Sequence, residues 1–405
     1  MTDWLTVEET LARLMAATPP APASELLELD DALGRVLALP LSAPRDVPAF
    51  DASQMDGIAL NSAQVLNEAG PAIDWPISQR ITAGDTPQAL QPATAARIFT
   101  GAPLPAGADV VVAQEDCEFT DDRVRFPRDQ VTAWRFVRRQ GSDTRTGDTV
   151  APAGIRLDAR HLAQAASIGN GQVMVYRRLK VGVLSTGDEL LSPGAEYRPG
   201  AVYDANRPLL CGMLRQLGAI PVDLGCAPDQ PEALRARLLD DTTMDLLVVS
   251  GGMSVGEEDH VKAVIQAHGG LDFWRVRVKP GKPFACGWLN RDGQRLPVFG
   301  LPGNPVSVLV TFLLFVRPWL LRASGREPLV DQWRPLTVLK PLAADRRETY
   351  LRVKVQADGA SAHTNQDSGA VSALAGSDGL LRIPAETEVA AGDRLDFIDY
   401  RSLLW

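Results

Sequence analysis

The sequence predicts an α/β multidomain protein with a three-layer α/β/α parallel-sheet domain, an inserted β-rich domain, a mixed N-terminal domain and a C-terminal β domain. With 405 residues, the chain exceeds one ordinary hydrophobic core and has room for roughly two to four domains. After residue 178, apolar strands alternate with helical segments, a pattern typical of a parallel sheet covered on both faces. Before and after that stretch, short segments broken by Pro and Gly indicate β-rich domains.

The first predicted domain consists of two segments, residues 1–42 and 142–177. Thr6 and Glu9 have the spacing of a capping box, so an amphipathic helix should begin at Val7. Helical patterning returns near residues 157–168, and a short strand follows at 173–176. The β-rich segment between the two parts, residues 43–141, is therefore predicted to be an insertion.

The parallel-sheet domain is predicted to span residues 178–327. Its strands are expected at Lys180–Leu184, in IPVDLG, in DLLVVSGG and in LPVFGLPGNP, with helices at Arg207–Leu217, Pro231–Leu239 and His260–Ala267. Residues 328–405 show short strands again, in LTVLK, YLRVKV, GLLRIP and RLDFID. They predict a small C-terminal β domain.

Composition and charge limit the classes of partner. A hydrophobic content of 45%, a charged content of 22% and a net charge of −9 fit a soluble globular protein and argue against nucleic-acid or membrane binding. Four cysteines without a C-x-x-C pair indicate neither a zinc site nor a disulfide framework, which fits a cytoplasmic location. The N-terminal residues lack a secretory signal, and the longest apolar run is about half the roughly 20 residues of a membrane span.

Three unusual loops follow predicted strands of the α/β domain: Ser185–Glu189, Ser250–Asp259 and Leu301–Ser307. In an open parallel sheet, ligands bind beyond the carboxyl ends of the strands, where such loops converge. Glycines allow close backbone approach, and hydroxyls can hold phosphate oxygens. One Gly-rich loop alone is more often a plain connection, but three at one edge predict a binding site.

The segment KPGKPF, Lys279–Phe284, carries two lysines on a turn stiffened by Pro280 and Pro283. Two ammonium groups on a rigid turn attract oxyanions. The alternative is a pair of surface lysines on a hairpin, and the flanking prolines make that reading weaker. We predict that this segment forms part of an oxyanion site at the edge of the α/β sheet.

Acidic residues in the same loops need a separate explanation. Asp188, Glu189, Glu257, Glu258 and Asp259 would repel a phosphate unless a cation neutralised them. Mg²⁺ takes one or two carboxylates together with phosphate oxygens and water, which would reconcile acids with an anionic ligand. The alternative, stabilisation of helix N-termini, accounts for one or two of them. Glu189 and Asp259 are the predicted metal ligands.

Eight segments together resemble one known family, the molybdopterin molybdenumtransferases, which include MoeA and the gephyrin E domain. They occur in the family's order: QMDG, TGAP, GADVVV, LSTGDEL, VYDANR, SGGMSVGEEDH, VKPGKPF and GLPGNPVS. The resemblance implies insertion of molybdenum from molybdate into adenylylated molybdopterin, with Mg²⁺, release of AMP and no covalent protein intermediate. It also implies a homodimer formed through the N-terminal domain, and a transient contact with the molybdopterin adenylyltransferase.

The resemblance also assigns roles to residues. It implies that the β-rich domain of the partner subunit brings Asp56 and Thr100 near the cleft. The catalytic set is Asp56, Thr100, Asp143, Glu189, Asp229, Asp259, Lys279, Lys282, Pro302 and Pro305. The molybdopterin and molybdate set is Ser185, Thr186, Gly187, Asp188, Ser250, Gly251, Gly252, Ser254, Gly256, Lys279, Lys282, Gly303, Asn304, Ser307, Arg352 and Ser368. Asp367 stands where the family commonly has glycine, and Arg198 has no assigned role.

Two other functions fit parts of the pattern. A molybdopterin adenylyltransferase would share the α/β domain but lack the flanking β domains, so an adenylylation assay would separate the two enzymes. A non-enzymatic scaffold that clusters receptors would bind a receptor segment and show no molybdopterin activity.

Overall fold

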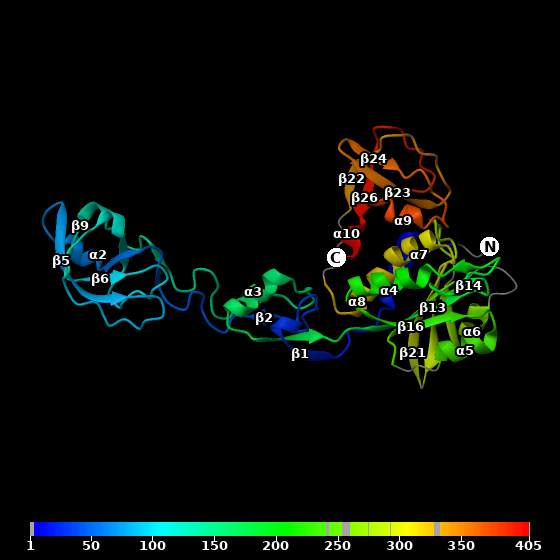
Figure 1. Cartoon of the computed structure of the whole chain (residues 1–405), viewed down its shortest axis with the longest axis horizontal. Coiled ribbons are helices and arrows are strands. Elements are labelled where there is room, and N and C mark those ends of the chain that lie inside the picture. The colour runs from blue at the N-terminus through cyan, green and yellow to red at the C-terminus, as the bar shows by residue number, and fades with distance from the viewer. Residues whose placement is uncertain are drawn as a thin grey trace.

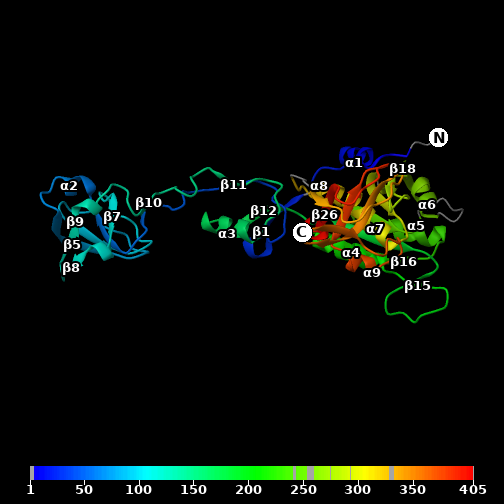
Figure 2. The same ribbon diagram turned by 90° about the horizontal axis from the view of Figure 1, so that it is seen from above.

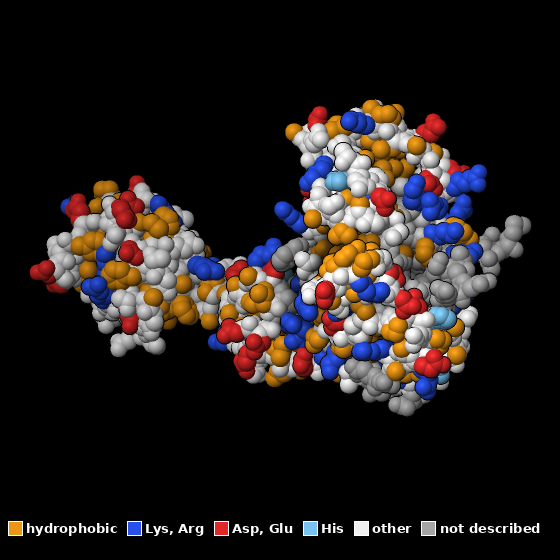
Figure 3. Space-filling view, turned by 45° about the vertical axis from the view of Figure 1, so that its right-hand side comes forward, with side chains coloured by type: hydrophobic (Ala, Val, Ile, Leu, Met, Phe, Trp, Pro, Cys, Tyr) orange, Lys and Arg blue, Asp and Glu red, His pale blue; other side chains and the backbone are white. Residues whose placement is uncertain are grey.

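The computed structural model describes residues 4–239, 243–252, 260–273, 275–291, 293–327 and 333–404. The molecule is elongated (Figures 1 and 2), with a β-rich unit at one end and an α/β unit at the other. A narrow N-terminal unit joins these two, and a C-terminal β unit lies against the α/β unit (Figure 1). Figure 3 shows the same separation as two globular masses connected by a thin waist.

The N-terminal unit is assembled from two distant segments of the chain. Its elements are β1 (Ser24–Glu28), η1 (Leu29–Asp31), β2 (Leu41–Ser42), β11 (Thr149–Ala151), α3 (Ala159–Ser167) and β12 (Gln172–Tyr176). Strand β1 pairs antiparallel with β12, and β2 pairs antiparallel with β11. A small core that includes Leu37, Ile168 and Val175 holds the two segments together. The β-rich unit is therefore inserted between them.

Helix α1 (Val7–Ala16) begins with the expected capping box, in which Thr6 and Glu9 exchange hydrogen bonds. Its buried side chains Val7 and Leu14 pack into the core of the α/β unit. The backbone N–H of Arg277 also donates to the carbonyl of Leu5. Although its residues fall in the predicted N-terminal domain, this helix lies against the α/β unit, because its apolar stripe is buried there.

The β-rich unit contains one six-stranded sheet in the order β7-β4-β6-β5-β9-β8. The elements are β3 (Ala52–Ser53), β4 (Gly57–Leu60), α2 (Ser62–Leu66), β5 (Ala72–Ile81), β6 (Ala95–Ile98), β7 (Val110–Ala113), η2 (Gln114–Asp116), β8 (Glu118–Phe119), β9 (Arg123–Pro127), η3 (Arg128–Gln130) and β10 (Val137–Arg138). Both faces are covered, since Ile58 and Val112 enter one core while Ala59 and Val111 enter another. Strand alternation accounts for this division.

The α/β unit is built on a six-stranded sheet in the order β16-β13-β17-β21-β20-β18. The strands are β13 (Lys180–Thr186), β16 (Ile220–Ala227), β17 (Leu246–Ser250), β18 (Gly269–Phe273), β20 (Ala285–Arg291) and β21 (Gln294–Leu301). The first four in spatial order are parallel, whereas β20 and β18 are antiparallel to their neighbours. The prediction of a parallel sheet is therefore wrong at this end. The connection from Arg291 to Gln294 is too short for the crossover that parallel strands need.

Helices cover both faces of this sheet, as predicted. One face carries α1, α4 (Asn206–Gln216), α7 (Pro305–Thr311), the π-helical turn η4 (Phe312–Val316) and α8 (Arg317–Ala323), and the other carries α5 (Pro231–Leu239) and α6 (His260–His268). Along β13, Val181 and Val183 face the first layer while Leu184 faces the second. Short strands β14 (Leu190–Leu191) and β15 (Val202–Tyr203) pair within a loop that protrudes beyond the sheet edge (Figure 2).

The helical stretch Pro305–Ala323 is long and apolar enough to cross a membrane by length and composition. However, 83% of its most apolar window is buried inside the protein. It packs against Phe284 and Phe299 in the largest core. Its apolar composition is therefore explained by its position at the centre of the α/β unit.

The C-terminal β unit contains a sheet in the order β19-β23-β25-β26-β22. Its elements are β19 (Val278–Lys279), β22 (Arg334–Thr337), β23 (Glu348–Gln356), β24 (Gly359–Ala362), α9 (Ser372–Ala375), β25 (Gly379–Ile383), β26 (Arg394–Asp399) and α10 (Tyr400–Leu404). Strand β19 belongs to this sheet because it pairs with β23. The segment KPGKPF was predicted at the edge of the α/β sheet, and the structure shows that it runs from the C-terminal sheet into that sheet.

Candidate functional site

The loops that follow β13, β17 and β21 meet at one edge of the α/β sheet. Ser185 lies in register with Ser250, and Ser250 lies in register with Leu301. The three strands are parallel, so their carboxyl ends point in the same direction. The structure therefore brings together the three loops that the sequence singled out.

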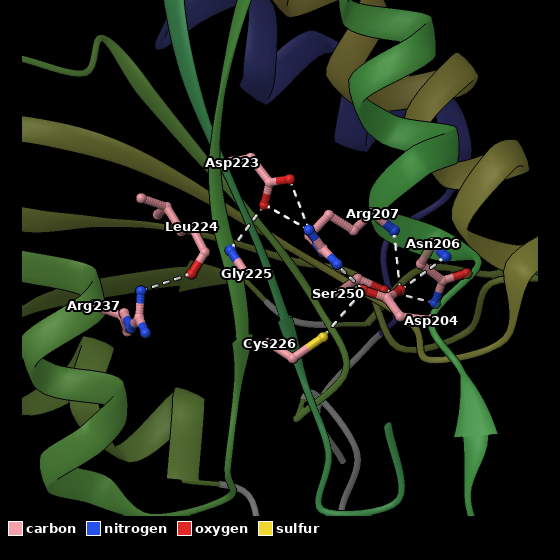
Figure 4. A network of polar contacts seen from close by, with 9 residues as sticks. All are labelled: Asp204, Asn206, Arg207, Asp223, Leu224, Gly225, Cys226, Arg237 and Ser250. Carbon is pink, nitrogen blue, oxygen red and sulfur yellow. Dashed lines mark hydrogen bonds and ion pairs between the residues drawn. The ribbon is translucent and has the colours of Figure 1, made fainter. Parts of the chain in front are cut away.

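Asn206, the first residue of α4, joins the end of β17 to the loop after β21, and its bond to Ser250 is drawn in Figure 4. Its amide nitrogen donates to the Ser250 hydroxyl at 2.8 Å and to the Gly303 carbonyl at 2.6 Å. The Ser250 hydroxyl lies 3.3 Å from the carbonyl of Pro302. Asn206 is only 9% exposed, so these bonds form in a region that excludes most water. Sequence reasoning did not assign it a role, although its motif VYDANR was recognised.

An ionic network next to Asn206 fixes the start of α4 (Figure 4). Arg207 binds Asp204 at 3.1 Å and Asp223 at 2.7 Å. Burial would raise the pKa of Asp223, but hydrogen bonds from Arg207 outweigh it and hold that pKa below its ordinary value. Burial, followed by the hydrogen bond to Asp204, raises the pKa of the Cys226 thiol to about 11. The sequence analysis also assigned no role to Asp204, Arg207 and Asp223. The available signal was Asp204, an acid two residues before Asn206 in the motif VYDANR.

Buried polar atoms gather at the end of β13. Within the part of the chain that the structure describes, the hydroxyls of Ser185 and Thr186 and the side-chain oxygen of Asn206 have no hydrogen-bond partner. Leaving such atoms unpaired costs free energy unless a ligand satisfies them. A Cβ on Gly251 would lie 2.5 Å from the Thr186 carbonyl, so glycine is required for this close packing. The edge is tight and rich in donors and acceptors.

The acidic loop after β13 is exposed. Asp188 and Glu189 both face solvent, and the backbone N–H of Asp229 donates to the Asp188 carboxylate at 3.1 Å. Arg198, from the protruding loop, donates to the Asp188 carbonyl and so fastens that loop to the acidic segment. The predicted residues Ser254, Gly256 and Asp259 lie outside the described residues. Among the described residues, the predicted acids of this edge thus come from two loops: Asp188 and Glu189 follow β13, and Asp229 follows β16.

The loop before α7 contacts the C-terminal β unit. Pro305 begins this helix, and the Asn304 amide donates to the Ser368 hydroxyl at 2.8 Å. The Val306 backbone N–H donates to the Ser368 carbonyl at 3.0 Å. Ser307 follows and is buried, with 5% of its surface exposed. Ser368 is therefore placed directly at the start of α7.

Arg352 lies beneath the Ser368 loop. Its guanidinium is buried and donates to the carbonyls of Asn365 at 2.9 Å and Asp367 at 3.1 Å. Burial lowers the pKa of Arg352. The Asp367 carboxylate accepts from the backbone N–H of Gly369 at 2.7 Å and so turns toward its own loop. In this arrangement Arg352 supports the loop that presents Ser368.

The two lysines of KPGKPF have partners in the structure. The Lys279 ammonium lies 2.8 Å from the carboxylate of Asp345, and the Lys282 ammonium lies 4.9 Å from the centre of the Trp4 ring. Gly281 packs on α7, since a Cβ there would lie 2.4 Å from a Thr311 methyl. The turn between the lysines is therefore held against the helix that begins with Pro305 and Ser307.

Three predicted residues lie away from the sheet edge. The Asp56 carboxylate accepts from the backbone N–H and the hydroxyl of Thr100 at 2.8 and 2.7 Å, and these bonds lower the pKa of Asp56. Both lie in the β-rich unit at the opposite end of the molecule (Figure 1). Asp143 follows β10 and pairs with Arg138 at 3.9 Å. Within one chain they are not brought to the other predicted site residues.

Comparison with known proteins accounts for nearly the whole chain. Family models match in three successive parts: the MoeA N-terminal region (domain I and II) at residues 5–169, a probable molybdopterin binding domain at 182–322, and the MoeA C-terminal region (domain IV) at 335–400. Molybdopterin molybdenumtransferase 2 from Mycobacterium tuberculosis is 35% identical, over 97% of this chain and 98% of that protein. The chain belongs to the MoeA family of molybdopterin molybdenumtransferases.

Other members of the family agree with this assignment. The molybdopterin molybdenumtransferase of Haemophilus influenzae is 37% identical, over 82% of this chain and 79% of that protein. The structure of the molybdopterin biosynthesis MoeA protein from Pyrococcus horikoshii matches with a TM-score of 0.86 at 31% identity, covering 98% of this chain and 99% of that one. The family's fold therefore extends through all four structural units described above.

Proposed function

We propose that this chain inserts molybdenum from molybdate into adenylylated molybdopterin and releases AMP, using the carboxyl edge of the α/β sheet. Relatives named as molybdopterin molybdenumtransferases align with this chain over most of their length. The proposal adds that the pterin substrate is adenylylated and that AMP is released. No step requires a covalent bond to the protein, since the reaction exchanges ligands between two bound substrates.

The single observation that carries the proposal is that Asn206 joins the end of β17 to the loop after β21, beside β13 hydroxyls that have no partner in the described chain. Asn206 binds Ser250 and Gly303, and the buried hydroxyls of Ser185 and Thr186 belong to the last two residues of β13 at the same edge. Gly251 and Gly252 pack closely on Thr186, where a Cβ would lie 2.5 Å from its carbonyl and 2.9 Å from its hydroxyl respectively, so both glycines keep this edge compact. These groups offer hydrogen bonds to the polar atoms of a pterin nucleotide.

Molybdate is proposed to bind beside this edge, where KPGKPF passes α7. Lys279 and Lys282 supply positive charge for a tetrahedral dianion, and Ser307 and Ser368 supply hydroxyls. Ser368 is held at the start of α7 by Asn304, and Arg352 holds its loop from below. The proposal therefore assigns recognition of molybdate to the junction between the α/β and C-terminal units.

Among the described residues, no group of three or more Asp, Glu, His or Cys side chains could hold a metal ion, so a cation here would also need substrate oxygens or acids outside the described part. Glu189 and Asp188 are exposed carboxylates on one loop, and Asp229 lies next to Asp188. Carboxylate oxygens suit Mg²⁺, which usually takes one or two of them together with substrate phosphates and water. Glu189 and Asp259 are proposed to hold the ion. When bound, it would neutralise the phosphate charge that otherwise repels these acids.

A second subunit is proposed to complete the site. Asp56 and Thr100 lie at the far end of the same chain, so their proposed catalytic roles require the β-rich unit of a partner (Figure 1). The N-terminal unit exposes apolar side chains suited to dimer formation, with Leu26 at 55%, Leu33 at 56% and Leu39 at 58% exposure. The proposed unit is a cytoplasmic homodimer, with a transient contact to the adenylyltransferase that supplies its substrate.

The test is an insertion assay with adenylylated molybdopterin, molybdate and Mg²⁺, read as AMP release and as reconstitution of an apo-molybdoenzyme. We expect Lys279→Ala to lower turnover by about a hundredfold or more, because it removes a charge next to the reacting oxyanion. Lys354→Ala is the matched control, since Lys354 pairs with Asp378 at 3.2 Å in the same sheet. It should stay near wild type.

The same assay separates the alternatives. Near-normal turnover by Lys279→Ala, with an unchanged melting temperature, would contradict the proposed role of Lys279. Formation of adenylylated molybdopterin from ATP without molybdenum insertion would assign the chain to adenylyl transfer instead. Asp259→Ala should also abolish insertion while the protein stays folded, as expected of a metal ligand.

A further inference from the structure

The ammonium of Lys279 is already paired with a carboxylate. Its nitrogen lies 2.8 Å from Asp345, whose side chain is 21% exposed while that of Lys279 is 48% exposed. Asp345 lies in the segment between β22 and β23, in the C-terminal unit. Any oxyanion that binds Lys279 therefore meets a negative charge at the same ammonium group.

Asp345 is held firmly in this position. Its second carboxylate oxygen accepts from the backbone N–H of Arg347 at 3.0 Å and from the guanidinium of Arg347 at 3.2 Å. Its carbonyl accepts from the backbone N–H of Glu386 at 2.7 Å. An ammonium, a guanidinium and an amide thus surround the carboxylate, and these are the donors that an oxyanion prefers.

The charge of Asp345 is present at neutral pH. Burial raises the pKa of this carboxyl, but the hydrogen bonds from Lys279 and Arg347 outweigh it and hold the pKa well below its ordinary value. Figure 3 shows Lys and Arg side chains gathered on the side where the C-terminal unit adjoins the α/β unit. Lys279 and Arg347 both lie within ion-pair distance of the Asp345 carboxylate, at 2.8 and 3.2 Å.

We propose that Asp345 is an internal competitor for the substrate oxyanion, holding the Lys279 ammonium until molybdate displaces it. This inference rests on the proposed function of Lys279 in molybdate binding. Because the Lys279 side chain is 48% exposed and that of Asp345 is 21% exposed, solvent still screens the pair, and exchanging one anion for another costs a modest free energy. Asp345 therefore lowers the affinity of the Lys279 ammonium for other anions, because an anion binds there only by displacing the carboxylate.

The test is titration of the full-length protein with inorganic molybdate by calorimetry at low ionic strength. Asp345→Asn keeps the size of the side chain and an acceptor for the Arg347 N–H, but removes the competing charge. We expect the dissociation constant for molybdate to fall by about two- to fivefold, the range of an exposed ion pair. Asp345→Glu keeps the charge and should bind molybdate like wild type.

Asp378→Asn is the matched control, because Asp378 pairs with Lys354 and also accepts a backbone N–H, that of Val355 at 2.9 Å. It removes the same charge from the same sheet and should leave the affinity unchanged. If the dissociation constant for molybdate fell equally in Asp378→Asn, the effect would come from net charge alone, and the proposal would be overturned. Weaker or unchanged binding in Asp345→Asn would also overturn it, since a pure positioning residue behaves that way.

Two further variants separate this inference from the proposed function. Lys279→Ala alone should weaken molybdate binding, and the double variant with Asp345→Asn should bind as weakly as Lys279→Ala. If Lys279→Ala leaves binding unchanged, the proposed function of Lys279 fails. If Lys279→Ala weakens binding but Asp345→Asn does not strengthen it, only the competitor role fails. Asp345→Ser provides a second removal of charge if Asp345→Asn does not fold, judged by its melting transition.

Discussion

The candidate site has two sides built on different physical principles. At the sheet edge, the buried residues Asn206 and Ser250 form a neutral hydrogen-bond network with the Gly303 carbonyl, and Gly251 packs closely on Thr186. At the junction with the C-terminal unit, Lys279 and Asp345 form a partly exposed ion pair, with side chains 48% and 21% exposed. A buried hydrogen-bond network is costly to break, whereas an exposed ion pair contributes little and is easily exchanged. The first side can fix a ligand's position, and the second can exchange anions.

The sharpest test of the buried side is Asn206→Ala. This change removes two donated bonds and leaves the Ser250 hydroxyl and the Gly303 carbonyl with fewer partners. We expect a loss of about 1–3 kcal/mol in the free energy of unfolding. Urea denaturation measures it, and the affinity for adenylylated molybdopterin should fall as well because the loops separate.

Asn290→Ala is the control for that experiment, since Asn290 lies exposed on β20 of the same sheet. It should change the free energy of unfolding by less than about 0.5 kcal/mol. Asn206→Asp cannot donate to Gly303 and places a buried carboxylate beside its carbonyl, so it should destabilise the protein at least as much as Asn206→Ala. If a variant at position 206 kept full stability, the buried network would be no more costly to break than the ion pair at Lys279.

A second test concerns the unpaired hydroxyls. Thr186→Val keeps the shape of the side chain and removes a buried hydroxyl that has no partner in the described chain. The free protein should therefore be equally stable or slightly more stable. The affinity for adenylylated molybdopterin should fall by about five- to tenfold, because the ligand loses one hydrogen bond of about 1 kcal/mol.

The comparison variant is Thr10→Val, at a buried threonine whose hydroxyl already donates to the Thr6 carbonyl at 2.7 Å. Losing that bond should lower stability without changing ligand affinity. If Thr186→Val destabilises the free protein as Thr10→Val does, then the Thr186 hydroxyl is part of the fold and does not await a ligand.

Much of the architecture could be predicted from local patterns. The capping box at Thr6, the helix Pro231–Leu239 and the strand Arg394–Asp399 all have strong local signals, and the structure confirms them. Strand β20 was missed because Ala285–Arg291 has no clear alternation and follows directly from the KPGKPF turn. The Asp292–Gly293 pair in the sequence is a hairpin signal that would have predicted the antiparallel strands.

The site was predictable only where residues cluster in sequence. Glycines, hydroxyls and lysines in adjacent positions indicated the loops, but Asn206 acts by joining Ser250 and Gly303, which are far from it in the chain. The partner of Lys279 is likewise 66 residues away, at Asp345. Such pairings depend on how the sheets pack, so a single sequence gives no direct signal for them.

The smallest loss of stability is expected for Asp223→Asn, in the ionic network at the start of α4. The Asp223 pKa lies below the ordinary value of 3.8 in the folded protein, so its stabilisation is complete above that pH and is lost as pH falls through the folded pKa. Because the Asp223 side chain is 51% exposed, Asp223→Asn should cost less than about 1 kcal/mol at pH 7.

Melting temperatures at pH 7 and near pH 3 check this prediction, because the variant should lose less stability on acidification than the wild type does. Asp74→Asn is the control, since Asp74 pairs with Arg123 on the surface of the β-rich unit, away from α4. A difference between wild type and Asp223→Asn that persists unchanged at low pH would mean that packing, and not the charge of Asp223, holds Arg207. In that case the ionic network would resemble the rigid buried side of the site more than the exchangeable ion pair at Lys279.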